Sequence, residues 1–149
     1  MTSPRMRPPT ARTRRYELTV GDGVVRECRE LTRRALSDWF GPAGDSGQLA
    51  VEDALLLVSE VVTNALMHGG VPYELRLDRS EGRLWVEVSD TSSVRPRPHG
   101  RHHASRPSGH GLYLLVRLAA AWGTVPRGSG KAVWFEVEVP GRAVGAGAT

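Results

Sequence analysis

The chain has 149 residues and a formal net charge of +4, from 20 basic and 16 acidic side chains. That length is about one domain and excludes most multi-domain enzymes, while 40% apolar and 24% charged residues are typical of a chain that buries a core. The single cysteine, Cys28, excludes an intrachain disulfide and favours a reducing compartment, so we expect a cytoplasmic protein. No apolar run reaches the roughly 18 residues of a membrane span, and the basic N-terminus lacks the apolar segment of a signal peptide.

Both ends of the chain lack an apolar period. Residues 1–13 hold three prolines and scattered arginines, and residues 141–149 consist mainly of Gly and Ala. Neither segment can bury enough apolar surface to order itself. We therefore expect a basic flexible tail, a single domain over residues 14–140, and a second flexible tail.

The first half of the domain predicts a strand and two helices. Residues 14–20 alternate as a strand does, and a helix with Asp22 as its N-cap then extends to Gly41. A longer and more apolar helix over residues 49–68 is ended by the pair Gly69 and Gly70.

The second half predicts a hairpin, a loop, a helix and a strand. Residues 73–77 and 84–88 alternate around a turn at 79–82, and residues 132–139 alternate as a closing strand. Between them, residues 91–108 form a proline- and arginine-rich loop, followed by a helix over 112–122. This order predicts an α/β (α+β) two-layer sandwich, a mixed and mainly antiparallel sheet with helices on one face.

Polar residues interrupt the apolar 49–68 helix at regular spacing. Glu60 and Asn64 lie four residues apart on one helix face, and His68 extends that row by another turn. A carboxylate can act as a general base and an amide oxygen can ligate Mg²⁺. Taken alone, the pattern favours a solvated helix face.

Asp90 and the segment 109–111 are two further candidates for ligand binding. Asp90 ends the second hairpin strand, where it either caps the turn of Thr91 and Ser92 or accepts a hydrogen bond from an exocyclic amine. Gly109 and Gly111 flank His110 just before a helix, where backbone N–H groups can bind an anion. Each signal is weak by itself, but the three occur in one order within about 50 residues.

That order resembles the ATP-binding domain of the GHKL superfamily, the Bergerat fold of type II topoisomerases and histidine kinases. Residues 59–65 resemble its N box, 90–92 its adenine-recognition box and 109–112 its second glycine box. The short chain and its ending over 130–135 are most similar to the anti-sigma-factor serine/threonine kinase branch of actinobacteria.

The resemblance implies a role for each matching residue. Glu60 would polarise the attacking hydroxyl, Asn64 would ligate Mg²⁺, and Asp90 would hold the adenine amino group. The remaining ATP contacts would come from His68, Ser92, Gly109, His110, Gly111 and Leu112. The 91–108 loop would close as a lid, with Arg95, Arg97, Arg101 or Arg106 over the phosphates.

Two positions depart from the family pattern. Ser92 stands where a glycine is common, and the hydroxyl often found near the base on the last strand aligns with Ala132. These departures predict fewer contacts with adenine. His110 adds a titratable group beside the phosphates.

Three functions remain open at this point. The leading one is an ATP-binding regulator that sequesters a sigma factor and phosphorylates Ser or Thr of an antagonist protein, with homodimerisation expected from the resemblance. The second is a protein-interaction module that binds ATP without turning it over. A nucleic-acid binder is the third and the least favoured, because no predicted helix has a basic stripe. Without the nine arginines of residues 1–15 and 91–108, the chain has 11 basic and 16 acidic residues. The net positive charge therefore comes from these two segments, and the rest of the chain is acidic.

Overall fold

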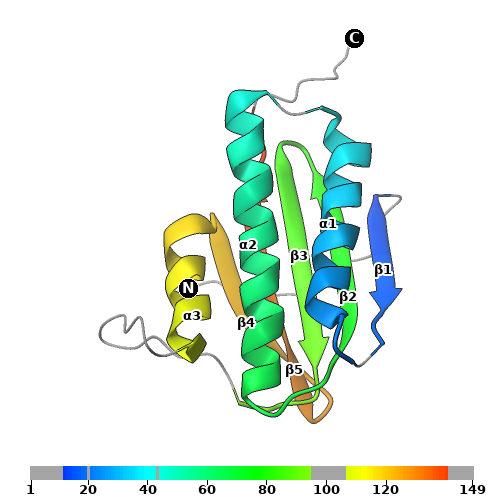
Figure 1. Cartoon of the computed structure of the whole chain (residues 1–149), viewed down its shortest axis with the longest axis vertical. Helices are drawn as coiled ribbons and strands as arrows, with labels where there is room; N and C mark the ends of the chain where they lie inside the picture. The colour runs from blue at the N-terminus through cyan, green and yellow to red at the C-terminus, as the bar shows by residue number, and fades with distance from the viewer. Residues whose placement is uncertain (1–11, 20, 43, 95–106, 141–149) are drawn as a thin grey trace.

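The structure is a computed structural model that describes residues 12–19, 21–42, 44–94 and 107–140. Its elements alternate between sheet and helix along the chain, so that the sheet is assembled from three separate stretches of sequence (Figure 1). In order they are β1 (Thr13–Glu17), α1 (Val24–Phe40), α2 (Asp45–Met67), β2 (Pro72–Ser80), β3 (Arg83–Asp90), α3 (Pro107–Leu118), β4 (Ala121–Arg127) and β5 (Gly130–Glu138).

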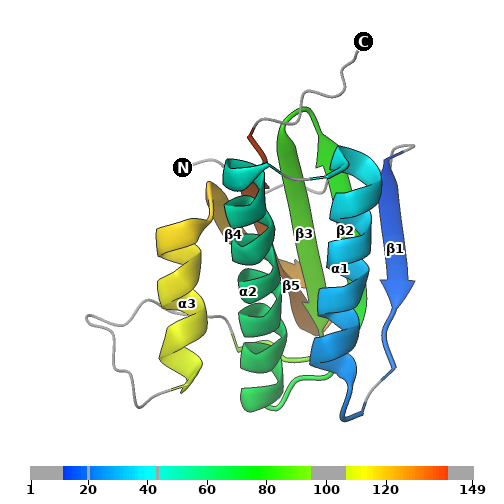
Figure 2. The same ribbon diagram turned by 45° about the horizontal axis from the view of Figure 1, so that its top comes forward.

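The five strands form one sheet in the order β1-β2-β3-β5-β4, and every neighbouring pair is antiparallel. The three helices lie side by side on one face of this sheet (Figures 1 and 2). The predicted two-layer α+β architecture is therefore confirmed, with a sheet that is antiparallel throughout the described strands.

The core lies between the sheet and the helices because strand residues alternate between the two faces. The inward-facing positions are apolar and buried on each central strand: Leu75 and Leu77, Leu84, Val86 and Val88, and Val133, Phe135 and Val137. Helix α2 covers them with buried residues at helical spacing, among them Leu57, Val58, Val61 and Val62. Helix α2 therefore packs on the centre of the sheet and forms a large part of the core.

The far face of the sheet carries no described helix, yet its central residues are also buried. Trp85 of β3 stacks on Trp134 of β5, with ring centroids 4.3 Å apart and an interplanar angle of 8°. On β2, Arg76 forms an ion pair of 3.0 Å with Asp78, and both side chains are almost fully buried.

The structure corrects several predicted boundaries. Helix α1 begins at Val24 after Gly23, which makes no side-chain capping bond, so Asp22 is not its N-cap. Helix α3 begins at Pro107 and ends at Leu118, although a start at Leu112 and an end at Trp122 were predicted. Residues 121–127 form the edge strand β4, which the sequence pattern did not reveal. Among the described residues, no helix combines the length and apolar character needed to cross a membrane.

Candidate functional site

The C-terminal half of α2 positions three of the predicted site residues. Glu60 and Asn64 are half-buried and one turn apart, and His68 is the exposed C-cap residue whose backbone N–H donates to the carbonyl of Asn64. The side-chain oxygen of Asn64, Oδ1, is buried and accepts no hydrogen bond from any described residue. A buried acceptor without a donor is costly, so this atom is suited to a ligand.

Asp90 lies at the end of β3, facing the same space from the sheet. Its side chain is 1% exposed, and Oδ1 accepts a hydrogen bond of 2.7 Å from the backbone N–H of Ser92. The hydroxyl of Ser92 in turn accepts a bond of 3.0 Å from the N–H of Val94. Asp90 and Ser92 thus form the capping turn that the sequence allowed, but the carboxylate retains further acceptor positions.

A buried lysine that was not among the predicted site residues faces Asp90. Lys131 is the cross-strand partner of Asp90 in the β3–β5 pair, and its Nζ lies 3.0 Å from Oδ2 and 3.1 Å from Oδ1. The third donor of Nζ reaches the carbonyl of Ser92 at 3.4 Å. Strand alternation places Lys131 on the helix-facing side of the sheet, and Ala132 on the other side. On the last strand, Lys131 therefore lies next to Asp90, whereas Ala132, which aligns with the family's hydroxyl position, is the cross-strand partner of Ser89.

Two glycines hold the backbone close to Asp90. A Cβ atom on Gly70 would lie 2.8 Å from Asp90 Oδ1, and one on Gly130 would lie 2.1 Å from the Asp90 carbonyl oxygen. Both distances are too short for any side chain. The sequence suggested Gly70 only as part of a helix stop, because its contact with Asp90 arises from the tertiary fold.

A small cavity connects these side chains. It is lined by Val61, Asn64, Ala65, Asp90, Leu115, Lys131 and Val133, and its volume is about 10 Å³. That is about the space of one water molecule, whereas drug-sized ligands occupy pockets of roughly 300–1,000 Å³. A ligand that contacts Asp90 must therefore move some of the surrounding side chains.

The second glycine box lies inside a helix. Gly109, His110, Gly111 and Leu112 belong to the first turns of α3, which begins two residues earlier at Pro107. Proline is favoured at the first helical position because it has no N–H to leave unpaired. The first free N–H groups of α3 can still favour an anion. The side chains of His110 and Leu112, and the lid arginines Arg95, Arg97, Arg101 and Arg106, lie outside the described residues.

The side-chain oxygen of Asn64 is also the described atom that is best suited to bind Mg²⁺. Within the described ranges, no group of three or more His, Cys, Asp or Glu side chains is placed to hold a metal ion alone. Mg²⁺ commonly takes one or two protein oxygens and completes its shell with phosphates and water. The buried, unbonded Asn64 Oδ1 fits that requirement as a single protein ligand.

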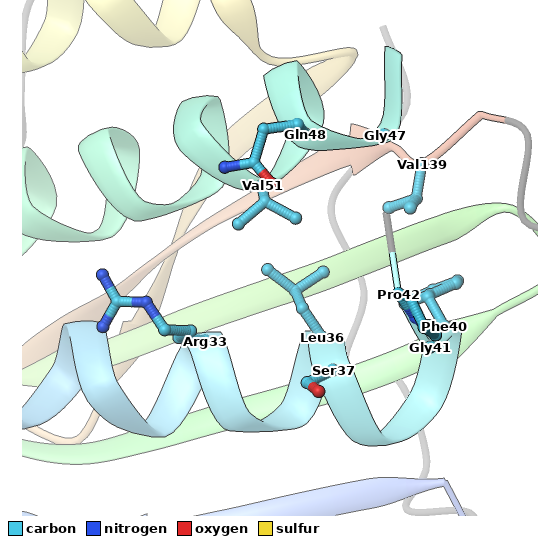
Figure 3. A pocket seen from close by; sticks show the side chains of 10 residues that line it. All are labelled: Arg33, Leu36, Ser37, Phe40, Gly41, Pro42, Gly47, Gln48, Val51 and Val139. Carbon is cyan, nitrogen blue, oxygen red and sulfur yellow. The ribbon is translucent and has the colours of Figure 1, made fainter. Parts of the chain in front are cut away.

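A second hollow lies at the opposite end of α2. It occupies about 220 Å³ between the end of α1 and the start of α2, and Leu36 and Val51 project into it from the two helices (Figure 3). Arg33, Gln48 and Val139 also line it. None of the predicted site residues lines it.

Comparison with protein families identifies the domain. Residues 24–136 match the histidine kinase-like ATPase domain. The chain belongs to this family. The match runs from the first residue of α1 into β5, and it includes Glu60, Asn64, Asp90 and Lys131. Membership of this ATPase family implies ATP binding. No curated protein matches the chain.

Two solved structures similar to this histidine kinase-like ATPase domain come from Erythrobacter litoralis EL346. The histidine kinase domain of a blue-light activated histidine kinase is 21% identical with a TM-score of 0.47, and the match covers 79% of this chain and 63% of that one. A structure of the blue-light activated histidine kinase is 25% identical with a TM-score of 0.45, over 74% and 40% of the two chains. The chain thus spans less than two thirds of either structure.

Proposed function

We propose that this histidine kinase-like ATPase domain binds Mg-ATP between α2, α3 and the β3–β5 end of the sheet, and transfers the γ-phosphoryl group to Ser or Thr of an antagonist protein. By phosphorylating the antagonist, the protein controls what fraction of its own molecules is free to bind and sequester a sigma factor. The single observation that carries the proposal is the convergence of Asn64 Oδ1, which has no described donor, with the buried Asp90 on one cavity.

Different described residues contact the base, the phosphates and Mg²⁺. Asp90 accepts a hydrogen bond from the exocyclic amine of the base, because its carboxylate faces the cavity from the sheet. The N-terminus of α3 favours the negative phosphates through its unpaired N–H groups. Asn64 supplies an oxygen to Mg²⁺, which when bound neutralises charge on the phosphates.

Glu60 is placed one turn before Asn64 on α2, in reach of a group that approaches the phosphate end from solvent. In the transfer, the substrate hydroxyl oxygen bonds to the γ-phosphorus while the bond from phosphorus to the β-phosphate oxygen breaks. The hydroxyl proton passes to the Glu60 carboxylate, and ADP is the leaving group. A general base of this kind contributes about 10²–10⁴-fold to the rate.

The test combines calorimetry with labelled phosphate transfer. Purified protein is titrated with Mg-ATP, then incubated with γ-labelled ATP, Mg²⁺ and candidate antagonist proteins, followed by phosphoamino-acid analysis. We expect Glu60→Gln to keep ATP affinity within about 2-fold and to lower transfer by about 100-fold or more. Asn64→Ala should weaken Mg-ATP binding by about 10-fold or more, the loss of one ligand to a charged partner.

Glu52→Gln provides the matched control, because Glu52 is an exposed carboxylate on the same helix, where it accepts a bond of 3.3 Å from Gln48. This variant should bind and transfer like the original protein. Transfer by Glu60→Gln at the original rate would remove Glu60 as the base. Tight ATP binding without any transfer would instead favour the non-catalytic interaction module, and no binding at millimolar ATP would contradict both functions.

A further inference from the structure

Lys131 places a donor directly beside the acceptor of Asp90. The ammonium has three N–H groups, and in the structure all three have acceptors: Oδ1 and Oδ2 of Asp90 and the carbonyl of Ser92. The Ser92 contact is the longest of the three, at 3.4 Å. It is therefore the weakest, and the one that a better acceptor would replace most easily.

Asp90 has one acceptor position still open. A carboxylate has about four lone-pair positions. Oδ1 accepts from the Ser92 N–H and from Lys131, and Oδ2 accepts from Lys131. The described residues thus leave a single position on Oδ2, and the Lys131 Nζ that bonds this oxygen also reaches the Ser92 carbonyl.

The resulting pattern is an acceptor next to an exchangeable donor, at the wall of one cavity. Both residues line the cavity with Asn64, and the Lys131 side chain is fixed because Lys131 and Asp90 are opposite each other in the β3–β5 register. The Watson–Crick edge of adenine has the complementary pattern, with the N6 amine as donor and ring nitrogen N1 as the adjacent acceptor. Proteins read bases through this edge by such paired hydrogen bonds.

We propose that Lys131 is a specificity-determining residue that donates a hydrogen bond to the N1 acceptor of adenine, while Asp90 Oδ2 accepts from the N6 amine. The inference rests on the proposed function, since it assumes that the base enters this cavity. On binding, Lys131 exchanges its bond to the Ser92 carbonyl for one to N1 and keeps its ion pair with Asp90. The base is then recognised by two protein side chains.

Nucleotide analogues test the inference in the unaltered protein. The probes are the magnesium complexes of ATP, 1-deaza-ATP, which lacks the N1 acceptor, and 7-deaza-ATP, which lacks a nitrogen on the other edge of the purine. By calorimetry we expect 7-deaza-ATP to bind within about 2-fold of ATP, and 1-deaza-ATP to bind at least about 10-fold more weakly, a difference of about 1.4 kcal/mol. Equal binding of ATP and 1-deaza-ATP would overturn the proposal.

A variant then assigns the contact to Lys131. In Lys131→Met the two ligands should bind alike, and Lys131→Arg, which retains a donor, should restore part of the difference. If Lys131→Met still discriminates against 1-deaza-ATP, another group reads N1 and the inference is wrong. Arg83→Met removes an exposed cation at the other end of β3 and should change none of these ratios.

The outcomes separate this inference from the function on which it rests. Absence of ATP binding contradicts the proposed function, whereas ATP binding without discrimination at N1 contradicts only the role of Lys131. Removing one member of a buried ion pair is destabilising, so far-UV circular dichroism of Lys131→Met accompanies the titration. If that variant does not fold, Lys131→Arg takes its place, and discrimination against 1-deaza-ATP that is unchanged in Lys131→Arg would contradict the role of Lys131.

Discussion

Asp90 is the residue on which the most constraints converge. It ends β3, it receives hydrogen bonds from Ser92 and Lys131, and the backbone of Gly70 packs directly against its carboxylate. A buried carboxylate held by several partners has little freedom to shift. Small changes around it should therefore affect the site more than equal changes elsewhere.

Substitution of Gly70 tests that constraint. A Cβ atom at this position would lie 2.8 Å from Asp90 Oδ1, 2.9 Å from Ser92 Cβ and 3.1 Å from the Ala65 carbonyl, so Gly70→Ala must displace Asp90 or the end of α2. We expect ATP affinity to fall by about 10-fold or more, with a stability loss of about 1–3 kcal/mol from overpacking. Calorimetry and urea denaturation measure the two effects.

Gly44→Ala is the matched control, because a Cβ atom there meets nothing within 4 Å. Its ATP affinity should equal that of the unaltered protein. If Gly70→Ala binds ATP as tightly as Gly44→Ala does, Gly70 is not needed to hold the Asp90 carboxylate in position.

Residues of the site differ in how far the sequence could reveal them. Glu60, Asn64 and Asp90 stand out because polar groups interrupt apolar patterns at fixed spacing. Lys131 lies 41 residues from Asp90 in the sequence, and their contact exists only because β3 and β5 pair in this register. No local pattern contains that information, although the alternation of β5 does place Lys131 on the same face as Val133.

Helix α2 is the element that joins the core to the site. Its inward side packs on the sheet and its outer side is exposed, so two adjacent residues at the boundary between the sides can differ sharply in burial. Leu57 is fully buried, whereas Leu56 is 42% exposed. These neighbours provide a comparison within one helix.

Truncation of each leucine tests how α2 is held. Leu57→Ala should lower the free energy of unfolding by about 2–5 kcal/mol, because it leaves a cavity in the core. Leu56→Ala should cost less than about 1 kcal/mol, since little apolar area is lost and alanine favours the helix. The urea midpoints of the two variants measure the difference, and similar midpoints would contradict the orientation of α2.

Elements with a strong period were predictable, and those with mixed signals were not. The hairpin of β2 and β3 and the buried side of α2 follow directly from apolar spacing. Strand β4 did not, because three alanines precede Trp122 as in a helix, and Gly123 and Pro126 are unusual in strands. Proline is tolerated here because β4 is the edge strand of the sheet that the described residues form. The early start of α3 required the recognition of Pro107 as a first helical residue.

At the scale of the whole molecule, Cys28 should make the free energy of unfolding decrease as the pH becomes alkaline. This free cysteine is a fully buried residue of α1, and burial, together with the charge of Glu27, raises the pKa of its thiol from 9.0 to about 12. Above pH 9 the unfolded chain loses the thiol proton while the folded chain keeps it. The stabilisation is therefore complete below pH 9 and is lost progressively as pH rises toward 12.

Urea unfolding between pH 8 and about pH 10.5 measures this dependence. The midpoint of the unaltered protein should fall more steeply than that of Cys28→Ala, which has no thiol to ionise. Other groups titrate equally in the two proteins, so the difference in slope belongs to Cys28. Parallel slopes would mean that the thiol ionises alike in the folded and unfolded chains.

Two of the hollows among the described residues lie at opposite ends of α2. Gln48 borders one and Asn64 the other, and the sixteen helical steps from Gln48 to Asn64 span about 24 Å at about 1.5 Å per residue. That separation is about three times the Debye length of roughly 8 Å at physiological salt, so charges at the two ends barely affect each other through solvent. Any influence of one end of α2 on the other must therefore pass through the protein and not through solvent, and a fluorescent label at Gln48 would report movement of this end without touching Asn64.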